Sequence, residues 1–189
     1  MRGVKREGYT IVEMLVAVAI FSLAFITISV IFLGFTGAQS RAAVSQRLLN
    51  EGSYMLELVA REIRMHAIDY SCAQATTRYV CLHSIDGEAI RIQFDATAAP
   101  AVIRVCKDYD ASPCTVGSPK WVTLSSSDLS IADMQFQIFP SVDPLGSDVT
   151  VGQIFHPLTT ITMTVAGGRG KSYQTFDLQT AVSSRVYGL

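Results

Sequence analysis

The chain has 189 residues with 15 basic and 16 acidic side chains, so its net charge is close to zero. A chain of this charge lacks the concentrated basic face that duplex binding requires, and we expect no nucleic acid partner. Its length suits one domain with an appended element, and that element is apolar, because no charged residue occurs between Met14 and Ser40.

The start of the chain is basic. Arg2, Lys5 and Arg6 outweigh Glu7, and the next basic residue is Arg41. Positive charge tends to stay on the cytoplasmic side of a membrane. The asymmetry therefore predicts that the first residues stay in the cytoplasm and that the rest of the chain crosses.

An uncharged, largely apolar segment occupies residues 14–40. About 20 apolar residues in a helix span a bilayer core, at about 1.5 Å per residue, so this segment crosses with a turn or two left over. We expect residues 9–40 to form a helix that lies in the membrane or in the core of a filament.

Glu13 is an acidic residue at the edge of this apolar segment. A carboxylate costs roughly 2.5–3.5 kcal/mol near the centre of a membrane helix and less near its end, so it requires a counter-charge. If the chain is cut after Gly8, Tyr9 gains an ammonium group four residues before Glu13, one helical turn away or within reach on a neighbouring subunit. The cut would therefore supply the charge that neutralises Glu13.

The ten residues GYTIVEMLVA, which begin at Gly8, closely resemble the class III signal of type IV prepilins and type II secretion pseudopilins. The resemblance implies that a membrane prepilin peptidase cuts after Gly8, which ends a cytoplasmic leader of residues 1–8, and methylates the new amino terminus at Tyr9. It also implies that Glu13 is the acidic residue used in subunit docking. Methylation leaves the amine charged, so the electrostatic argument is unchanged. The family usually has Phe or Met where this chain has Tyr9.

Two alternatives compete with this interpretation. An ordinary secretory signal would be cut after Ala38, in the small-residue stretch that precedes Gln39, but its apolar region spans about 7–15 residues and avoids charge. A plain single-pass anchor has no need of Glu13.

The sequence from residue 41 to residue 68 predicts a continuation of the same helix, because no proline interrupts it and apolar residues recur at spacings of four and seven. This apolar stripe consists of Val44, Leu48, Met55, Val59 and Ile63. Gly52 lies within this stretch, and we expect it to permit a bend. Residues 9–68 would then form one helix of roughly 90 Å, with its second half packed against a sheet.

Cys72, Cys81, Cys106 and Cys114 follow the apolar segment, and none belongs to a C-x-x-C pair, which argues against a zinc or thioredoxin-type site. Outside the cytoplasm, an even number of cysteines predicts two disulfides. Three pairings are possible. We favour Cys72 with Cys81 and Cys106 with Cys114, because each pair closes a short loop; buried reduced thiols are the alternative.

From residue 69 to residue 189 the pattern changes to the period of two that is typical of half-buried antiparallel strands. Apolar and polar residues alternate at positions 90–94, 103–105, 134–138, 161–165 and 176–182. Gly167, Gly168 and Gly170 predict the turn between the last two strands, and residues 141–157 predict a surface loop. The fold class is therefore α+β, a long helix packed on an antiparallel sheet of five to seven strands.

The sequence contains no recognisable catalytic constellation. His66, His83 and His156 lie in different segments without ligand spacing, which predicts packed or solvated side chains and no metal site. The run from Gly168 to Ser172 lacks the first glycine of a phosphate-binding loop and joins two predicted strands, so we exclude that motif. We expect neither an enzyme nor a cofactor.

The end of the chain is loosely similar to the ends of minor pilins and of J-type minor pseudopilins, at residues 121–124, 131–139 and 178–185. The resemblance implies a minor subunit that is anchored in the inner membrane by a single pass, with its C-terminal domain outside the cytoplasm. Other pilin or pseudopilin subunits and an inner-membrane assembly platform would be its partners, in a type IV pilus or a type II secretion pseudopilus. The alternative is an anchored or secreted domain that binds its ligand outside any filament.

Overall fold

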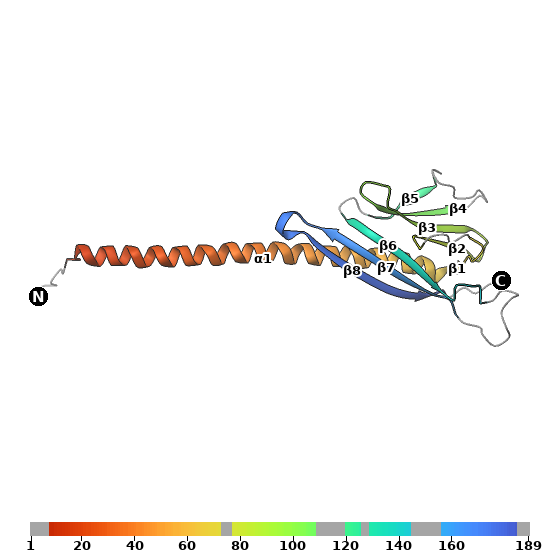
Figure 1. The fold of residues 1–189 in the computed structure, drawn as a ribbon, viewed down its shortest axis with the longest axis horizontal. Coiled ribbons are helices and arrows are strands. Elements are labelled where there is room, and N and C mark those ends of the chain that lie inside the picture. The colour runs from red at the N-terminus through yellow and green to blue at the C-terminus, as the bar shows by residue number, and fades with distance from the viewer. Residues whose placement is uncertain (1–7, 73–76, 109–119, 126–128, 145–155, 185–189) are drawn as a thin grey trace, which may run out of the picture. The chain divides into compact units, whose positions relative to one another are not determined.

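The computed structural model describes residues 8–72, 77–108, 120–125, 129–144 and 156–184 (Figure 1). Within these residues the chain forms a long helix α1 (Ile11–Met65), eight strands and a short 3-10 helix η1 (Gly170–Ser172). The strands are β1 (Ala67–Ile68), β2 (Tyr79–His83), β3 (Ala89–Asp95), β4 (Val102–Asp108), β5 (Trp121–Thr123), β6 (Ser130–Phe139), β7 (Leu158–Gly167) and β8 (Gln174–Ser183). The fold is therefore α+β, as the sequence predicts.

Helix α1 passes through both of the compact units into which the chain divides, residues 1–43 and 44–189. It is shorter at each end than the predicted span of residues 9–68. It begins only after Thr10, and it ends at Met65 because Ala67 and Ile68 pair with β2 as the first strand of a sheet. The prediction of one continuous helix through the apolar and amphipathic segments is otherwise confirmed.

Strands β1 to β5 form an antiparallel sheet in chain order. Residues 96–101 connect β3 to β4, and at the start of this connection the Asp95 carboxylate accepts hydrogen bonds from the backbone N and the hydroxyl of Thr97 at 2.9 and 2.6 Å. Strand β2 lacks the alternating pattern because its three central residues are all buried. A continuous apolar run does not distinguish a buried strand from other buried segments.

Strands β6, β7 and β8 form a second antiparallel sheet, so the expected single sheet of five to seven strands is wrong. β7 and β8 pair over ten residues without a register shift. The predicted glycine turn joins them, with Gly168 at φ 96° and Gly170 at φ 54°, which are values that residues with a side chain rarely adopt.

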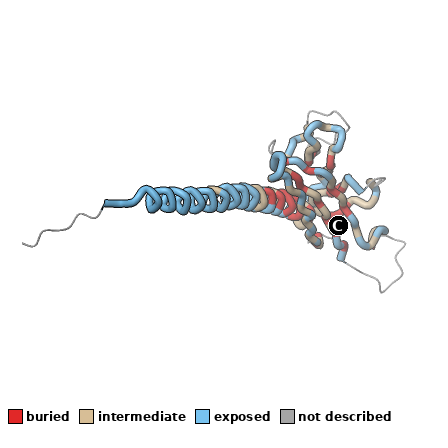
Figure 2. Tube along the Cα trace, turned by 60° about the vertical axis from the view of Figure 1, so that its left-hand side comes forward, coloured by how far each residue is buried: buried red, intermediate tan, exposed pale blue. Residues whose placement is uncertain are grey.

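The domain of residues 44–189 has one apolar core, to which α1 and both sheets contribute. The predicted stripe of α1 supplies its helical part: Leu48, Met55, Val59 and Ile63 are buried, and Val44 packs against the core while partly exposed. In Figure 2 the buried positions of α1 lie in this later part of the helix. Alternate residues of β7 face this core and are almost fully buried. They supply part of the core that the sheet contributes.

Candidate functional site

The predicted processing segment lies at the start of α1. Gly8 and Tyr9 are exposed and precede the helix, and Thr10 caps it, because its hydroxyl accepts a hydrogen bond from Glu13 N at 3.2 Å. Glu13 occupies the first turn, where the helix dipole favours a negative charge. A threonine followed three residues later by glutamate is the sequence signature of a helix start, so Glu13 has a local role besides its predicted one.

The first part of α1 exposes its apolar side chains on all sides. Every Val, Leu, Ile, Met and Phe from Ile11 to Phe35 is more than half exposed. An apolar surface that surrounds a helix requires lipid or other protein around it. These 25 residues extend for about 38 Å, which exceeds the roughly 30 Å of a bilayer core. By length and composition α1 is suited to cross a membrane, and its most apolar stretch is not buried by the rest of the chain.

Hydroxyl groups within the apolar run are satisfied by the helix itself. Ser22 Oγ donates to Val18 O and Ser29 Oγ donates to Phe25 O, both at 2.8 Å. Thr27 bonds to the carbonyl three residues before it in the same way. These bonds need no water, so the hydroxyls are compatible with a hydrocarbon environment.

Gly52 lies at a close contact between α1 and the three-stranded sheet. A Cβ atom at this position would lie 2.5 Å from Leu178 Cδ1 of β8 and 3.4 Å from Val165 Cγ1 of β7. The glycine therefore lies within a continuous helix and permits close packing. The expected bend at this position stays a prediction. Leu48 makes the same kind of approach to Gly167, where a Cβ would lie 2.8 Å from Leu48 Cδ2.

Helix α1 and strand β8 run side by side in the same direction. Ser45 is hydrogen-bonded to Gln174, Gly52 packs against Leu178, and the Ser184 hydroxyl donates to His66 O at 2.6 Å. Residue numbers therefore increase in the same direction along the helix and along the strand. The helical stretch between the first and last contacts rises about 32 Å and the strand about 33 Å, so the two elements are matched in length.

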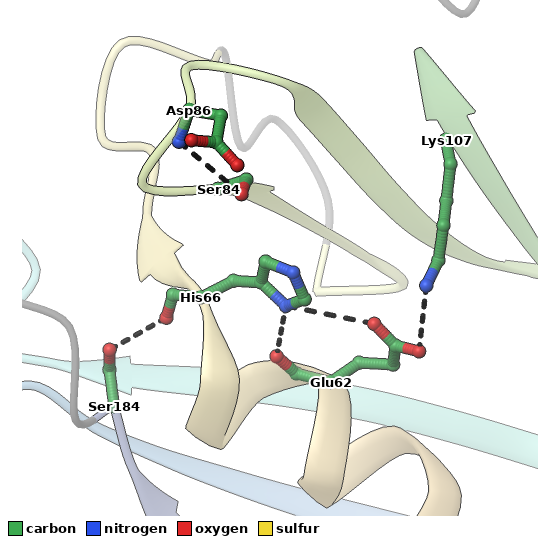
Figure 3. Close-up of polar contacts among 6 residues, drawn as sticks. All are labelled: Glu62, His66, Ser84, Asp86, Lys107 and Ser184. Atoms are coloured by element: carbon green, nitrogen blue, oxygen red, sulfur yellow. Dashed lines mark hydrogen bonds and ion pairs between the residues drawn. The ribbon is translucent and has the colours of Figure 1, made fainter. Parts of the chain in front are cut away.

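A polar cluster ties the last turn of α1 to both sheets (Figure 3). Lys107 Nζ of β4 lies 3.0 Å from Glu62 Oε1, and His66 Nδ1 lies 2.7 Å from the Glu62 carbonyl oxygen. Ser184, directly after β8, binds the His66 carbonyl. His66 is thus a packed residue at the helix end, as its isolated position in the sequence predicts.

A comparison with family models gives a match over residues 4–29, to the prokaryotic N-terminal methylation motif. The start of the chain carries this motif. The match supports a type IV pilin-like precursor that is processed by prepilin peptidase and assembles with other pilins. Searches of curated proteins and of solved structures gave no match.

The methylation motif covers Gly8, Tyr9 and Glu13, but the structure does not place Tyr9 one helical turn from Glu13, because Tyr9 precedes the helix. Arg2, Lys5 and Arg6 lie outside the described residues. The cut at Gly8, the methylation of Tyr9 and the docking role of Glu13 therefore stay predictions.

The cysteine prediction is confirmed where the structure describes it. Cys72 and Cys81 form a disulfide across nine positions of sequence, and Cys106 is also disulfide-bonded. Cys114, the predicted partner of Cys106, lies outside the described residues. No cluster of three or more potential metal ligands occurs in the described part of the chain.

Sequence reasoning missed two features of this site. The capping role of Thr10 had a readable signal in its spacing from Glu13. The close approach at Gly52 had none, because the residues that meet it lie more than 100 positions later in the chain.

Proposed function

We propose that this chain is a minor subunit of a type IV pilus or a type II secretion pseudopilus, with a structural rather than an enzymatic role. One observation carries the proposal: a single helix joins an exposed apolar segment, which begins within the methylation motif, to a stripe buried in the domain core. Such a helix attaches the domain to a membrane before assembly and to other subunits afterwards.

The electrostatic role of Glu13 follows from the cut. In the uncut chain the Tyr9 nitrogen is a peptide amide, which carries no charge. Cleavage after Gly8 converts it to an ammonium group on a residue that precedes the helix, and that group pairs with a carboxylate on a neighbouring subunit. Pairing there neutralises both charges within an apolar assembly, where an isolated carboxylate is unfavourable by a few kcal/mol.

The other expected partners, and the orientation of the chain in the membrane, follow from the same motif and from the charges of the leader. Prepilin peptidase cuts and methylates the chain, and an inner-membrane platform moves it into the filament. The basic leader holds residues 1–8 in the cytoplasm and directs the domain to the other side, where its disulfides are stable. The loose similarity of the last strands to J-type subunits favours a minor subunit over a major one.

Mass spectrometry of the mature chain, isolated from its native membrane, tests the cut. We expect a mature chain that begins with N-methyl-Tyr9. A chain that begins at Gln39 would show an ordinary secretory signal, and an intact Met1 would show a plain anchor; either result refutes the proposal.

Two substitutions separate the charge of Glu13 from its place in the capped first turn. Glu13→Gln keeps the side-chain size and removes the charge, while Thr10→Ala removes the capping hydroxyl and keeps the charge. We expect complete cleavage of both variants and loss of filament incorporation for Glu13→Gln alone. Normal incorporation of Glu13→Gln would contradict the docking role, and equal loss in both variants would assign the effect to the helix start.

A further inference from the structure

Strand β8 is a long, open edge of the three-stranded sheet. Within the described residues it pairs with β7 and with no other strand, over ten residues without a bulge. Edge strands are normally blunted by proline, lysine, a bulge or a short length. β8 has none of these, and its single charged residue, Asp177, accepts a hydrogen bond from Thr164 of β7 at 2.7 Å.

The inner face of β8 leaves apolar surface uncovered. Phe176 and Leu178 lie opposite Val165 and Met163 of β7, which are almost fully buried, yet both β8 residues are only partly buried. An additional strand beyond β8 would cover them in the way that β8 covers β7. Backbone groups along the edge would supply the hydrogen bonds, and the apolar residues would favour a strand that alternates apolar and polar side chains.

The other described edges do not offer a comparable surface. β1 and β5, the edges of the five-stranded sheet, have two and three residues. The outer side of β6 is occupied by the segment before β2, since Phe136 N donates to Thr77 O and Arg78 pairs with Asp133 at 3.3 Å. Among the described strands of a second copy, only its own β8 would therefore be available for a ten-residue pairing.

Pairing between two copies of β8 conflicts with a shared membrane. An antiparallel pair reverses one strand, and because α1 runs in the same direction as β8, it also reverses the helix. The two chains would then enter their domains, each at Val44, from opposite ends of the pair. A parallel pair related by a twofold axis turns the apolar face of one strand toward the polar face of the other, so Phe176 and Leu178 stay uncovered.

We propose that the β8 edge binds an extended, amphipathic strand of a different subunit of the same filament, which adds a fourth strand to this sheet. The inference rests on the proposed function, because only a filament supplies neighbours whose helices share one direction. If a pilin-like neighbour has its helix parallel to α1, its strands run parallel or antiparallel to β8, as pairing requires. The added strand places apolar residues beside Phe176 and Leu178 and leaves polar residues on the outer face.

The first experiment uses the full-length chain in detergent micelles and a synthetic peptide with the β7 sequence LTTITMTVAG, extended by two lysines for solubility. This peptide has the required alternation, because it already pairs with the opposite side of β8. We expect saturable binding by fluorescence anisotropy and slower amide hydrogen exchange across residues 174–183. A scrambled peptide should do neither. Absence of saturable binding or of added protection overturns the proposal.

Two variants move one positive charge between the faces of β8. Thr180→Lys places a lysine on the inner face, where an added strand would bury it, and Gln179→Lys places one on the exposed outer face. We expect Thr180→Lys to weaken peptide binding at least about tenfold and Gln179→Lys to leave it nearly unchanged. Equal effects contradict the predicted strand orientation. If Thr180→Lys fails to fold, hydrogen exchange on the unmodified chain still decides the question.

Sedimentation of the full-length chain without peptide tests self-pairing. We expect a monomer; a dimer that Thr180→Lys dissociates would identify a second copy as the occupant and overturn the proposal. In cells, both lysine variants should be cut after Gly8, while Thr180→Lys alone is depleted from sheared filaments. Equal incorporation contradicts the edge pairing. Failure of the Gly8 cut instead contradicts the proposed function and leaves the peptide result unaffected.

Discussion

Replacing Gly52 with alanine tests whether α1 packs on the three-stranded sheet as closely as the structure shows. The added methyl group would lie 2.5 Å from Leu178 Cδ1, which is too close without movement. Leu178 lies on an edge strand and is only partly buried, so part of the overlap is relieved by rotation of its side chain.

Two opposing effects set the magnitude. Overpacking of a buried contact costs about 1–3 kcal/mol, while alanine is better than glycine inside a helix by about 0.5–1 kcal/mol. We therefore expect Gly52→Ala to destabilise the domain by about 1 kcal/mol. When Leu178 is replaced by alanine, the nearest remaining atom is Val165 Cγ1 at 3.4 Å, so the same change should stabilise by about 0.5 kcal/mol.

The assay is a double-mutant cycle on the full-length chain in detergent, with intact disulfides. Denaturant unfolding is followed by the fluorescence of Trp121, the single tryptophan of the sequence. Gly37→Ala is the matched control, because it lies in the same helix and its Cβ would meet no other atom within 4 Å. The control should not destabilise the domain.

A change of sign between the two backgrounds is the expected signature, with a coupling energy of about 1.5 kcal/mol. If Gly52→Ala has the same effect with leucine or alanine at position 178, the two residues do not limit the approach of helix and strand. The reasoning about close packing would then be refuted.

Three further predictions concern the domain. Cys72→Ser should lower the free energy of unfolding by about 2–3 kcal/mol, measured by the same denaturation, because the bond to Cys81 restricts the unfolded chain. Hydrogen bonds from Thr97 lower the pKa of Asp95, so its stabilising contribution is present at neutral pH and lost as pH falls through that lowered value; the stability difference from Asp95→Asn should shrink in acid. Burial raises the pKa of Tyr70 to about 12, so its contribution to stability is lost as pH rises from 10 through that value, and absorbance at 295 nm should show a late-titrating component that Tyr70→Phe removes.

Much of the fold was predictable because its signals are local. The uncharged run, the stripe from Val44 to Ile63 and the alternation in five strands each depend on residues a few positions apart. Strand β2 lacked such a signal, since its central residues are buried together. The separation into two sheets depends on which strands pair, and that pairing is decided by contacts between distant segments.

The amino-acid sequence by itself determined the basic start, the motif around Gly8, the length of the apolar segment and the amphipathic stripe that continues it. Charge, hydropathy and helical spacing are properties of neighbouring residues, so they can be derived without knowledge of the fold. Only the tertiary structure decided that Gly52 meets Leu178 and that β8 lies at a sheet edge beside a stretch of α1 that matches it in length and direction. Those features arise when segments more than 100 positions apart bury their apolar faces together, and no local pattern records which segments meet.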